Sequence, residues 1–431
     1  MTENKREDRW SSPQMQLRLR RRQRAEKSFR WLGALAIGLA LGSLAILIGT
    51  VALRGAGAFV GTEVLLDVEL VPTAFDRPEG VSFEESQDLL AGADYRGLVR
   101  ASLRSLFPDV EKRRERRDLG SLMSRGAGSA LRDEVLRDPS RIGETISVWL
   151  PADDELDLFR KSGDEASERF GAAKSRWAME LDRDGRLRST LNMSFLTSGD
   201  SREPELAGVW GALMGSFWTL VVTLVLVLPL GVAAAVYLEE FATRNRWTEM
   251  IEVNINNLAA VPSIVFGLLG LAFFLGAMDL PRSAPLVGGL TLALMTLPTI
   301  IITSRVSIQA VPPSIREAAL GVGASPQQVV AHHVLPVAMP GILTGTIIGM
   351  ARALGETAPL LMIGMVAFVV DIPGGFTDAA TALPVQIFLW ADSPERAFVE
   401  KTSGAILVLL AFLIAMNGTA IGLRRRFEKR W

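Results

Sequence analysis

The stretch that decides the fold separates two long apolar runs. It reads Ser304-Arg-Val-Ser-Ile-Gln-Ala-Val-Pro-Pro-Ser-Ile-Arg-Glu-Ala-Ala-Leu-Gly-Val-Gly-Ala-Ser-Pro-Gln-Gln-Val-Val-Ala-His-His-Val-Leu-Pro336. Ser314 and Glu317 have the spacing of a capping box, which predicts the start of a short helix. That helix is expected to end near the flexible Gly321 and Gly323.

A second short helix is predicted from Pro326 to about His333, stopped before Pro336. In the first helix, the small residues Ala318 and Ala319 keep one face shallow enough for close packing. The result is a helix–glycine–helix elbow, and such an elbow can fit a groove on a partner protein.

Outward from the elbow, the chain contains six apolar stretches that meet or approach the roughly 20 residues needed to cross a bilayer. They are Trp31–Leu53, Ala212–Tyr237, Ile255–Met278, Ala284–Thr303, Gly341–Val370 and Gly404–Leu423. The fifth is over-long and carries Arg352, Glu356 and Pro359, so a bent or broken helix is predicted there. The predicted fold class is mainly α, a polytopic membrane protein with six transmembrane helices.

Basic residues set the expected orientation, because Lys and Arg near span ends stay in the cytoplasm. They cluster in Arg18–Arg24 and again in Arg424–Arg430, which predicts that both termini are cytoplasmic. Ala56-Gly57-Ala58 resembles a signal-peptide cleavage site. The preceding apolar run of 23 residues and the intervening Arg54 favour an uncleaved anchor.

Charged and apolar residues are segregated along the chain, which is 49% hydrophobic and 22% charged. This segregation predicts one membrane domain and one soluble domain. The predicted order is a basic cytoplasmic N-terminus (1–30), a first transmembrane helix (31–53), a periplasmic α+β domain (54–206), a transmembrane domain of five helices with a cytoplasmic loop at 304–337 (207–423) and a basic cytoplasmic tail (424–431).

Within the soluble insert, Ser82 and Glu85 have capping-box spacing and predict a helix start. A helix ending near Pro108 is predicted by apolar residues at three- and four-residue steps, namely Tyr95, Leu98, Val99, Leu103 and Leu106. The arginine-rich run Glu111–Asp118 is interpreted as a solvated helix face rather than a binding patch. Around the turn Asp184-Gly185, a β-hairpin is predicted by the alternating residues Trp177, Met179, Leu181, Leu187, Leu191, Met193 and Phe195.

Several chemistries are excluded by composition. The chain has no cysteine, and a net charge of −1 offers no electrostatic case for nucleic acid. His332 and His333 are its only histidines, and no acidic or thiolate cluster accompanies them to hold a metal. No phosphate-binding Gly-x-x-x-x-Gly-Lys-Ser/Thr loop occurs, because Lys174-Ser175 follows Ala173. We therefore expect a chain that is not an enzyme and takes its energy from a partner.

The elbow resembles the EAA loop of bacterial ABC importer permeases in six residues, Glu317, Ala318, Ala319, Gly323, Leu335 and Pro336. The resemblance implies that these residues dock into a separate ATPase and couple its closure to movement of the spans. His333 stands where the family usually has isoleucine.

Within the fifth span, Arg352 and Glu356 lie one helical turn apart and can pair, with Thr357 beside them. Ionisable residues at membrane depth usually face a polar pathway or each other. Two roles are therefore possible for this pair: it lies on the substrate pathway, or it stabilises a bent helix. The two roles are compatible with each other.

A closer resemblance, over roughly residues 207–431, is to phosphate importer permeases of the PstA type. It rests on Leu258–Gly270, Gly341–Gly345, Arg352–Pro359 and Leu383–Ile387, the last in an external loop. It implies a phosphate importer in the bacterial inner membrane, in which this chain forms half of the pathway and holds no cofactor. The implied partners are a PstC-type permease, a PstB-type ATPase dimer that uses ATP and Mg, and a periplasmic PstS-type phosphate-binding protein.

Two alternatives stay open. One is a permease for another oxyanion, sulfate or molybdate, which would have the same coupling loop. The other is a membrane sensor with a periplasmic domain, which should continue into a cytosolic signalling module. The apolar spans that follow the insert count against the sensor.

Overall fold

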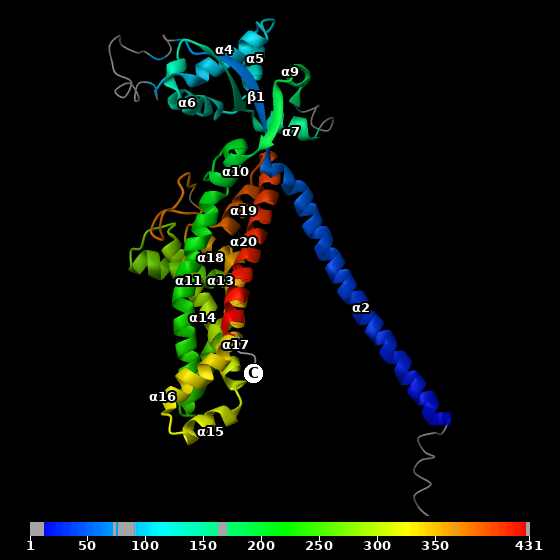
Figure 1. The fold of residues 1–431 in the computed structure, drawn as a ribbon, viewed down its shortest axis with the longest axis vertical. Coiled ribbons are helices and arrows are strands. Elements are labelled where there is room, and N and C mark those ends of the chain that lie inside the picture. The colour runs from blue at the N-terminus through cyan, green and yellow to red at the C-terminus, as the bar shows by residue number, and fades with distance from the viewer. Residues whose placement is uncertain are drawn as a thin grey trace, which may run out of the picture. The chain divides into compact units, whose positions relative to one another are not determined.

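The computed structural model describes residues 13–71, 75, 90, 92–162, 170–366 and 368–427. It consists of two compact units, residues 1–54 and 55–431 (Figure 1). The described residues of the first unit form one helix, α2 (Pro13–Gly55), which contains the predicted first span. The predicted helix start at Ser82 and Glu85 lies outside the described residues.

The soluble insert is built on a three-stranded antiparallel sheet. Its strands are β1 (Val60–Glu69), β2 (Thr145–Pro151) and β3 (Leu187–Leu191), in the order β2-β1-β3. Alternate residues of β1 are buried, as expected for a strand with one face on a core. The central strand thus begins within a few residues of the first apolar helix.

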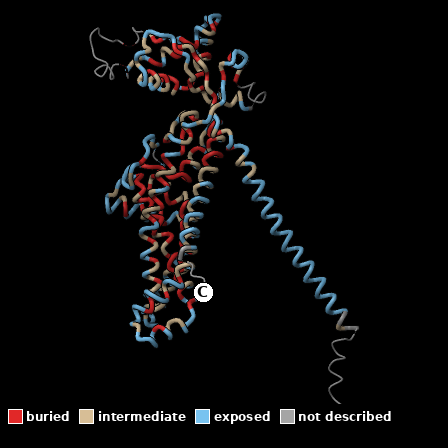
Figure 2. Tube along the Cα trace, viewed as in Figure 1, coloured by how far each residue is buried: buried red, intermediate tan, exposed pale blue. Residues whose placement is uncertain are grey.

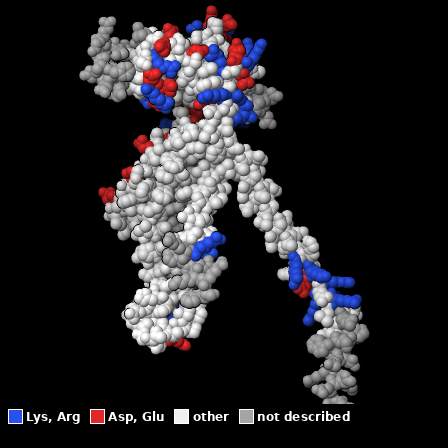
Figure 3. All heavy atoms as spheres, in the orientation of Figure 1, with Lys and Arg blue, Asp and Glu red and all other residues white. Residues whose placement is uncertain are grey.

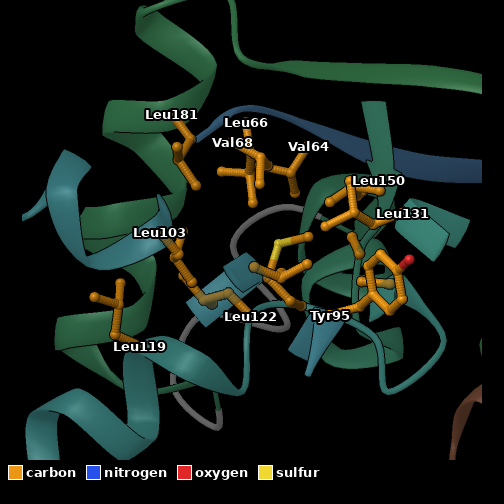
Figure 4. Packing of buried hydrophobic residues seen from close by; sticks show 14 of the residues in the cluster. Val64, Leu66, Val68, Tyr95, Leu103, Leu119, Leu122, Leu131, Leu150 and Leu181 are labelled. Atoms are coloured by element: carbon orange, nitrogen blue, oxygen red, sulfur yellow. The ribbon is translucent and has the colours of Figure 1, made fainter. Parts of the chain in front are cut away.

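Short helices cover the buried face of this sheet. They are α4 (Tyr95–Leu106), α5 (Arg113–Gly120), α6 (Ala127–Arg137), α7 (Asp154–Ser162) and α9 (Ala172–Arg183). Figure 4 shows the core between the layers, where Val64, Leu66 and Val68 of the sheet meet leucines such as Leu103 and Leu181. The predicted α+β insert is confirmed, and so is the helix that ends before Pro108.

The predicted hairpin around Asp184-Gly185 is wrong in its first strand. Trp177 and Leu181 lie on helix α9, both buried, and four residues apart they satisfy a helical period as well as an alternating one. Leu187–Leu191 does form a strand, but its partner is the distant β1. Beyond it, Met193 belongs to a short helix, α10 (Met193–Thr197).

The membrane part contains four long apolar helices, α11 (Trp210–Val236), α14 (Pro285–Gln309), α17 (Leu335–Gly355) and α20 (Ala397–Phe427). Two further helices, α12 (Arg246–Ala259) and α13 (Ser263–Gly270, extended by a π-helical stretch to Ala277), meet at an angle of 99°. With α2, the described residues hold five helices able to span a membrane, or six if the bent pair is one span.

The predicted span Ile255–Met278 is therefore a bent pair of helices rather than one continuous helix. The break lies at Ala260–Pro262, where Pro262 adopts an extended backbone conformation and cannot donate a helical hydrogen bond. The predicted break in the fifth span is confirmed, since α17 ends at Gly355 and a short helix, α18 (Ala358–Met362), follows.

Glycines let the long helices approach closely. A Cβ added at Gly289 would lie 2.5 Å from the Val222 side chain, and one at Gly231 would lie 2.7 Å from Ile300. At the same contact, the Thr223 hydroxyl donates to the Gly289 carbonyl at 3.1 Å. Small residues and such side-chain hydrogen bonds hold helices together in lipid. Figure 2 shows the buried positions running along these facing sides.

The core of the insert offers a direct test of the sheet. Leu66→Ala empties a fully buried position of β1 and should cost about 2–5 kcal/mol, whereas Leu191→Ala, at a position 56% exposed on β3, should cost under about 0.5 kcal/mol. Thermal unfolding of the full chain in detergent, followed by near-UV circular dichroism, should show an early transition only for the first variant. Equal transitions would contradict the assigned core.

Candidate functional site

The elbow contains helix α15 (Pro313–Gly321), a turn, and helix α16 (Pro326–Val329). After α15, the amides of Gly323 and Ala324 donate to the carbonyls of Leu320 and Ala319 at 2.9 and 3.1 Å. This is the Schellman pattern, which places Gly323 in a left-handed conformation, here at a φ of +90°. Gly323 therefore ends the helix as predicted.

The start of α15 differs from the prediction. The residue before its first turn is Pro312, and no side chain caps this end, so Ser314 and Glu317 form no capping box. Pro313 fills the first helical position, where a missing N–H costs nothing. The capping box is instead at the second helix, between Ser325 and Gln328.

The second helix of the elbow does not stop before Pro336. Helix α16 continues through a π-helical turn, Val330–Val334, directly into α17. Pro336 then lies directly after the π-helical turn, and its missing N–H removes one hydrogen bond from the otherwise continuous helical run. The second helix of the elbow is thus a continuous extension of a membrane helix.

The elbow has a buried underside and an exposed outer face. Ala319 packs into a cluster with Val311 and Val334, while Ala318 and Glu317 face outward. Leu335 is half-buried, and Gly323 and Pro336 are exposed. Only one of the two alanines therefore serves the close packing that was predicted for both.

An ionic clamp, which the sequence analysis missed, holds the elbow to the π-helical stretch Tyr237–Phe241 that follows α11. Arg316 makes a forked contact to Glu240, with Nε and Nη2 at 3.1 and 2.7 Å from the same oxygen. Its Nη1 and Nη2 also donate to the carbonyls of Val311 and Ile308 at 2.7 and 3.0 Å. Both side chains are largely buried, with exposures of 25% and 12%. Arg316 therefore joins three segments at once.

A second ion-pair group lies beside the first. Arg305 contacts Glu239 at 2.5 Å and Glu252 at 2.8 Å, and Gln309 donates to Glu239 at 2.9 Å. The acidic pair Glu239-Glu240 directly after an apolar span was the available signal, because charges there need nearby partners. Its partners are more than 60 residues away, so spacing could not assign them.

The other predicted site lies at the far end of α17. Arg352 Nε is 3.4 Å from Glu356 Oε1, and the Arg352 side chain is 61% exposed while that of Glu356 is 19% exposed. Thr357 is the residue before helix α18. The pair predicted from spacing is confirmed, and its arginine remains open to one side.

The two sites lie at opposite ends of one helix. From Leu335 to Arg352, a rise of ~1.5 Å per residue gives about 25 Å, close to the ~30 Å hydrocarbon thickness. The elbow and the Arg352 segment are therefore joined by one helix.

The segment Leu383–Ile387 belongs to a short helix, α19 (Leu383–Ala391), rather than a loop. Its Gln386 is buried and donates to the Gly208 carbonyl at 2.9 Å. Trp390 donates to Asp200 at 3.0 Å. Burial raises the pKa of the Asp200 carboxyl, against the lowering effect of that hydrogen bond. These bonds tie α19 to the start of α11.

Comparison with known proteins identifies the class of the chain. Residues 227–431 match the family described as binding-protein-dependent transport system inner membrane component. The phosphate transport system permease protein PstA 1 of Mycobacterium tuberculosis (strain H37Rv) is 32% identical over 222 residues, which are 52% of this chain and 71% of the relative. The chain belongs to this permease family. It is a transport subunit that works with a separate ATPase and a substrate-binding protein, and it is a multi-pass inner membrane protein.

Other similarities complete the comparison. The phosphate transport system permease protein PstA of Haemophilus influenzae is 29% identical over 228 residues, 53% of this permease and 79% of the relative. An inward-facing structure of the MetNI methionine ABC transporter aligns with 52% of this chain and 95% of its own, at 19% identity and a TM-score of 0.38. Residues 16–169 match a domain of unknown function, DUF3333.

The clamp predicts a specific defect in the permease. Arg316→Lys keeps the charge but cannot contact Glu240 and both carbonyls together, so buried acceptors lose their donors. We expect stimulation of the partner ATPase by the loaded binding protein to fall at least tenfold in reconstituted complexes. Arg244→Lys, at an exposed arginine near the same end of α11, should retain it within twofold. Equal activity of the two variants would show that the clamp has no part in coupling.

Proposed function

We propose that this chain is a permease subunit of an ATP-driven phosphate importer, forming half of the translocation pathway. The observation that carries the coupling part is the clamped elbow, with Glu317, Ala318, Ala319, Gly323, Leu335 and Pro336 as the proposed ATPase-coupling residues. The relatives named phosphate transport system permease proteins support phosphate as the substrate.

The outer face of the elbow has the character of a docking surface. Leu320 is 51% exposed and Val322 is 84% exposed, beside the exposed Glu317. Large apolar side chains at the tip of a rigid elbow are expected to insert into a pocket of a partner. The proposed partner at this face is a cytoplasmic ATPase dimer of the PstB type, which binds and uses ATP and Mg.

Substitutions at two glycines of the elbow can distinguish the effect of backbone strain from the effect of a larger side chain. A Cβ meets open space at both Gly321 and Gly323, but only Gly323 has a positive φ. Gly323→Val should therefore distort the turn and lower phosphate uptake at least tenfold, while Gly321→Val should stay within twofold. Membrane insertion, measured by blotting of membrane fractions, should be normal for both. Normal uptake by Gly323→Val would remove the turn from the coupling mechanism.

Arg352, Glu356 and Thr357 are the proposed pathway residues. The exposed guanidinium group of Arg352 can donate hydrogen bonds to a phosphate oxyanion. The neighbouring Glu356 carboxylate weakens the binding of the anion, so that it can leave. A PstC-type permease subunit would supply the other half of the pathway.

This role predicts a graded effect at one position. Arg352→Ala should abolish phosphate uptake in a correctly assembled complex, and Arg352→Lys should retain part of it because the charge remains. Uptake of radiolabelled phosphate, normalised to complex isolated by affinity tag, measures both. Normal transport by Arg352→Ala would leave only a structural role.

The proposed orientation places both termini in the cytoplasm and residues 54–206 in the periplasm, where a PstS-type binding protein delivers phosphate. Arg424 near the end of α20 donates to Thr344 in the first half of α17, so this end lies on the elbow side of the spans. Since the chain has no cysteine, single cysteines introduced at exposed positions and tested with an impermeant thiol reagent can check the sidedness of each segment.

The central experiment is uptake of labelled phosphate in cells that lack their own high-affinity permease and express this chain with its neighbouring transporter genes. Uptake that requires the chain and is unaffected by excess sulfate or molybdate supports the proposal. Uptake of sulfate or molybdate instead would keep the permease class and replace the substrate. A complex that assembles but transports none of them would leave a sensor with a periplasmic domain.

A further inference from the structure

The insert contains an open groove of about 940 Å³ whose walls are dominated by arginine. Three arginines come from α4, Arg96, Arg100 and Arg104. Figure 3 shows basic and acidic side chains interspersed over this domain, while the visible face of the membrane part carries few charges.

The remaining arginines of the groove come from the neighbouring segment. Arg113, Arg116 and Arg117 belong to α5, and Arg125 follows it. Among the described residues of the lining, the acidic ones are Glu111 and Asp153. The described part of the lining therefore carries seven guanidinium groups against two carboxyl groups, a formal excess of positive charge.

The helical period explains why these arginines converge. On α4 they recur every four residues and so share one side of the helix, while Val99 and Leu103 fill the insert core. On α5, steps of three and four residues do the same. Neither helix was expected to form a site, because the α5 run alone resembles an ordinary solvated face.

Most of this charge has no partner in the described part of the chain. Arg125 pairs with Glu203 at 2.7 Å, and Arg116 Nε donates to the Val110 carbonyl at 3.0 Å. The described residues provide no hydrogen bond or ion pair for the other five, Arg96, Arg100, Arg104, Arg113 and Arg117. Like charges at four-residue spacing destabilise a helix, so a bound anion would stabilise both walls.

We propose that this groove binds a molecule that carries two or more phosphate groups close together. A guanidinium fork matches phosphate oxygens in geometry and charge. The groove volume lies in the range of small-molecule sites, ~300–1,000 Å³. A single phosphate group carries about −1.5 to −2 charge at neutral pH, so it would leave most of the positive charge of the groove unneutralised.

The floor of the groove is compatible with an anionic ligand. Buried Ser124 and Met123 form part of it, beside the partly buried Asp153. Burial, with a smaller effect of the adjacent Asp154 carboxylate, raises the pKa of Asp153 to about 7. At neutral pH its carboxyl is therefore partly protonated, which limits its repulsion of the ligand.

The groove also allows a steric test without a change of charge. A Cβ at Gly120, which lines it, meets no atom within 4 Å, and its backbone suits any residue. Gly120→Trp should therefore fill the groove and leave the fold in place. Arg114 lies on α5 but not in the lining, so Arg114→Glu matches Arg117→Glu in charge change and helix.

Sodium tripolyphosphate is the first probe, titrated by calorimetry into the full chain in phosphatidylcholine nanodiscs without divalent cations. We expect saturable binding that is at least tenfold tighter than binding of orthophosphate. Arg100→Glu, Arg117→Glu and Gly120→Trp should each weaken tripolyphosphate binding at least tenfold, and Arg114→Glu by less than threefold. Circular dichroism should show the same fold for all four variants.

Because cardiolipin headgroups offer the same paired phosphates, a second titration uses nanodiscs that contain cardiolipin. If cardiolipin occupies the groove, the unsubstituted chain should lose tripolyphosphate binding in these nanodiscs. Arg100→Glu, which weakens binding of both ligands, should then bind tripolyphosphate as weakly as it does without cardiolipin. Unchanged binding would assign a soluble ligand.

Three results would overturn the proposal. The first is that tripolyphosphate shows no saturable binding. The second is that Arg114→Glu and Arg117→Glu weaken tripolyphosphate binding equally. The third is that Arg100→Glu weakens association of the binding protein but leaves tripolyphosphate binding intact. The last would make the groove a protein-docking surface. Since these titrations measure binding and not uptake, their outcome is independent of the transported substrate.

Discussion

Close contact between helices α11, α14 and α17 supports the rest of the membrane part. Apolar side chains gain nothing by leaving lipid for one another, so the helices are held by packing at small residues and by hydrogen bonds. Gly289 and Gly231 let α11 meet α14, and Gly345 lets α17 meet Thr303 of α14. With these three helices in place, the loop between α14 and α17 is held at both ends, and its shape follows.

The clamp at this loop adds a second layer of constraint. Arg316 satisfies a buried carboxylate and two backbone carbonyls together, an arrangement in which losing any one partner is costly. Because α16 continues through the π-helical turn into α17, the second half of the elbow and the membrane helix form one continuous helical element. The Arg352–Glu356 pair at the far end of that helix, next to a break in the chain, is well placed to respond.

The insert follows different rules. Its core is an ordinary sheet covered by helices, and its charged residues lie outside that core. The arginine groove is distinct from the coupling elbow and from the Arg352 segment, and each has its own chemistry. A permease with such a domain can bind a multivalent anion outside its translocation pathway, which separates that binding from the transported substrate.

Much of this organisation was determined by the sequence itself. Long apolar runs are expected to form helices, because a backbone in lipid has no water to bond and a helix pairs its N–H and C=O groups with one another. The apolar period of α4 and the glycine after α15 are equally local, and so both were predictable, as was the pairing of Arg352 with Glu356. Only the tertiary structure decided the pairing of β1 with two distant strands, the sharp bend at Pro262, the partner of Arg316 and the arginine groove. Each of these depends on residues far apart in the chain, whose meeting is set by packing rather than by spacing.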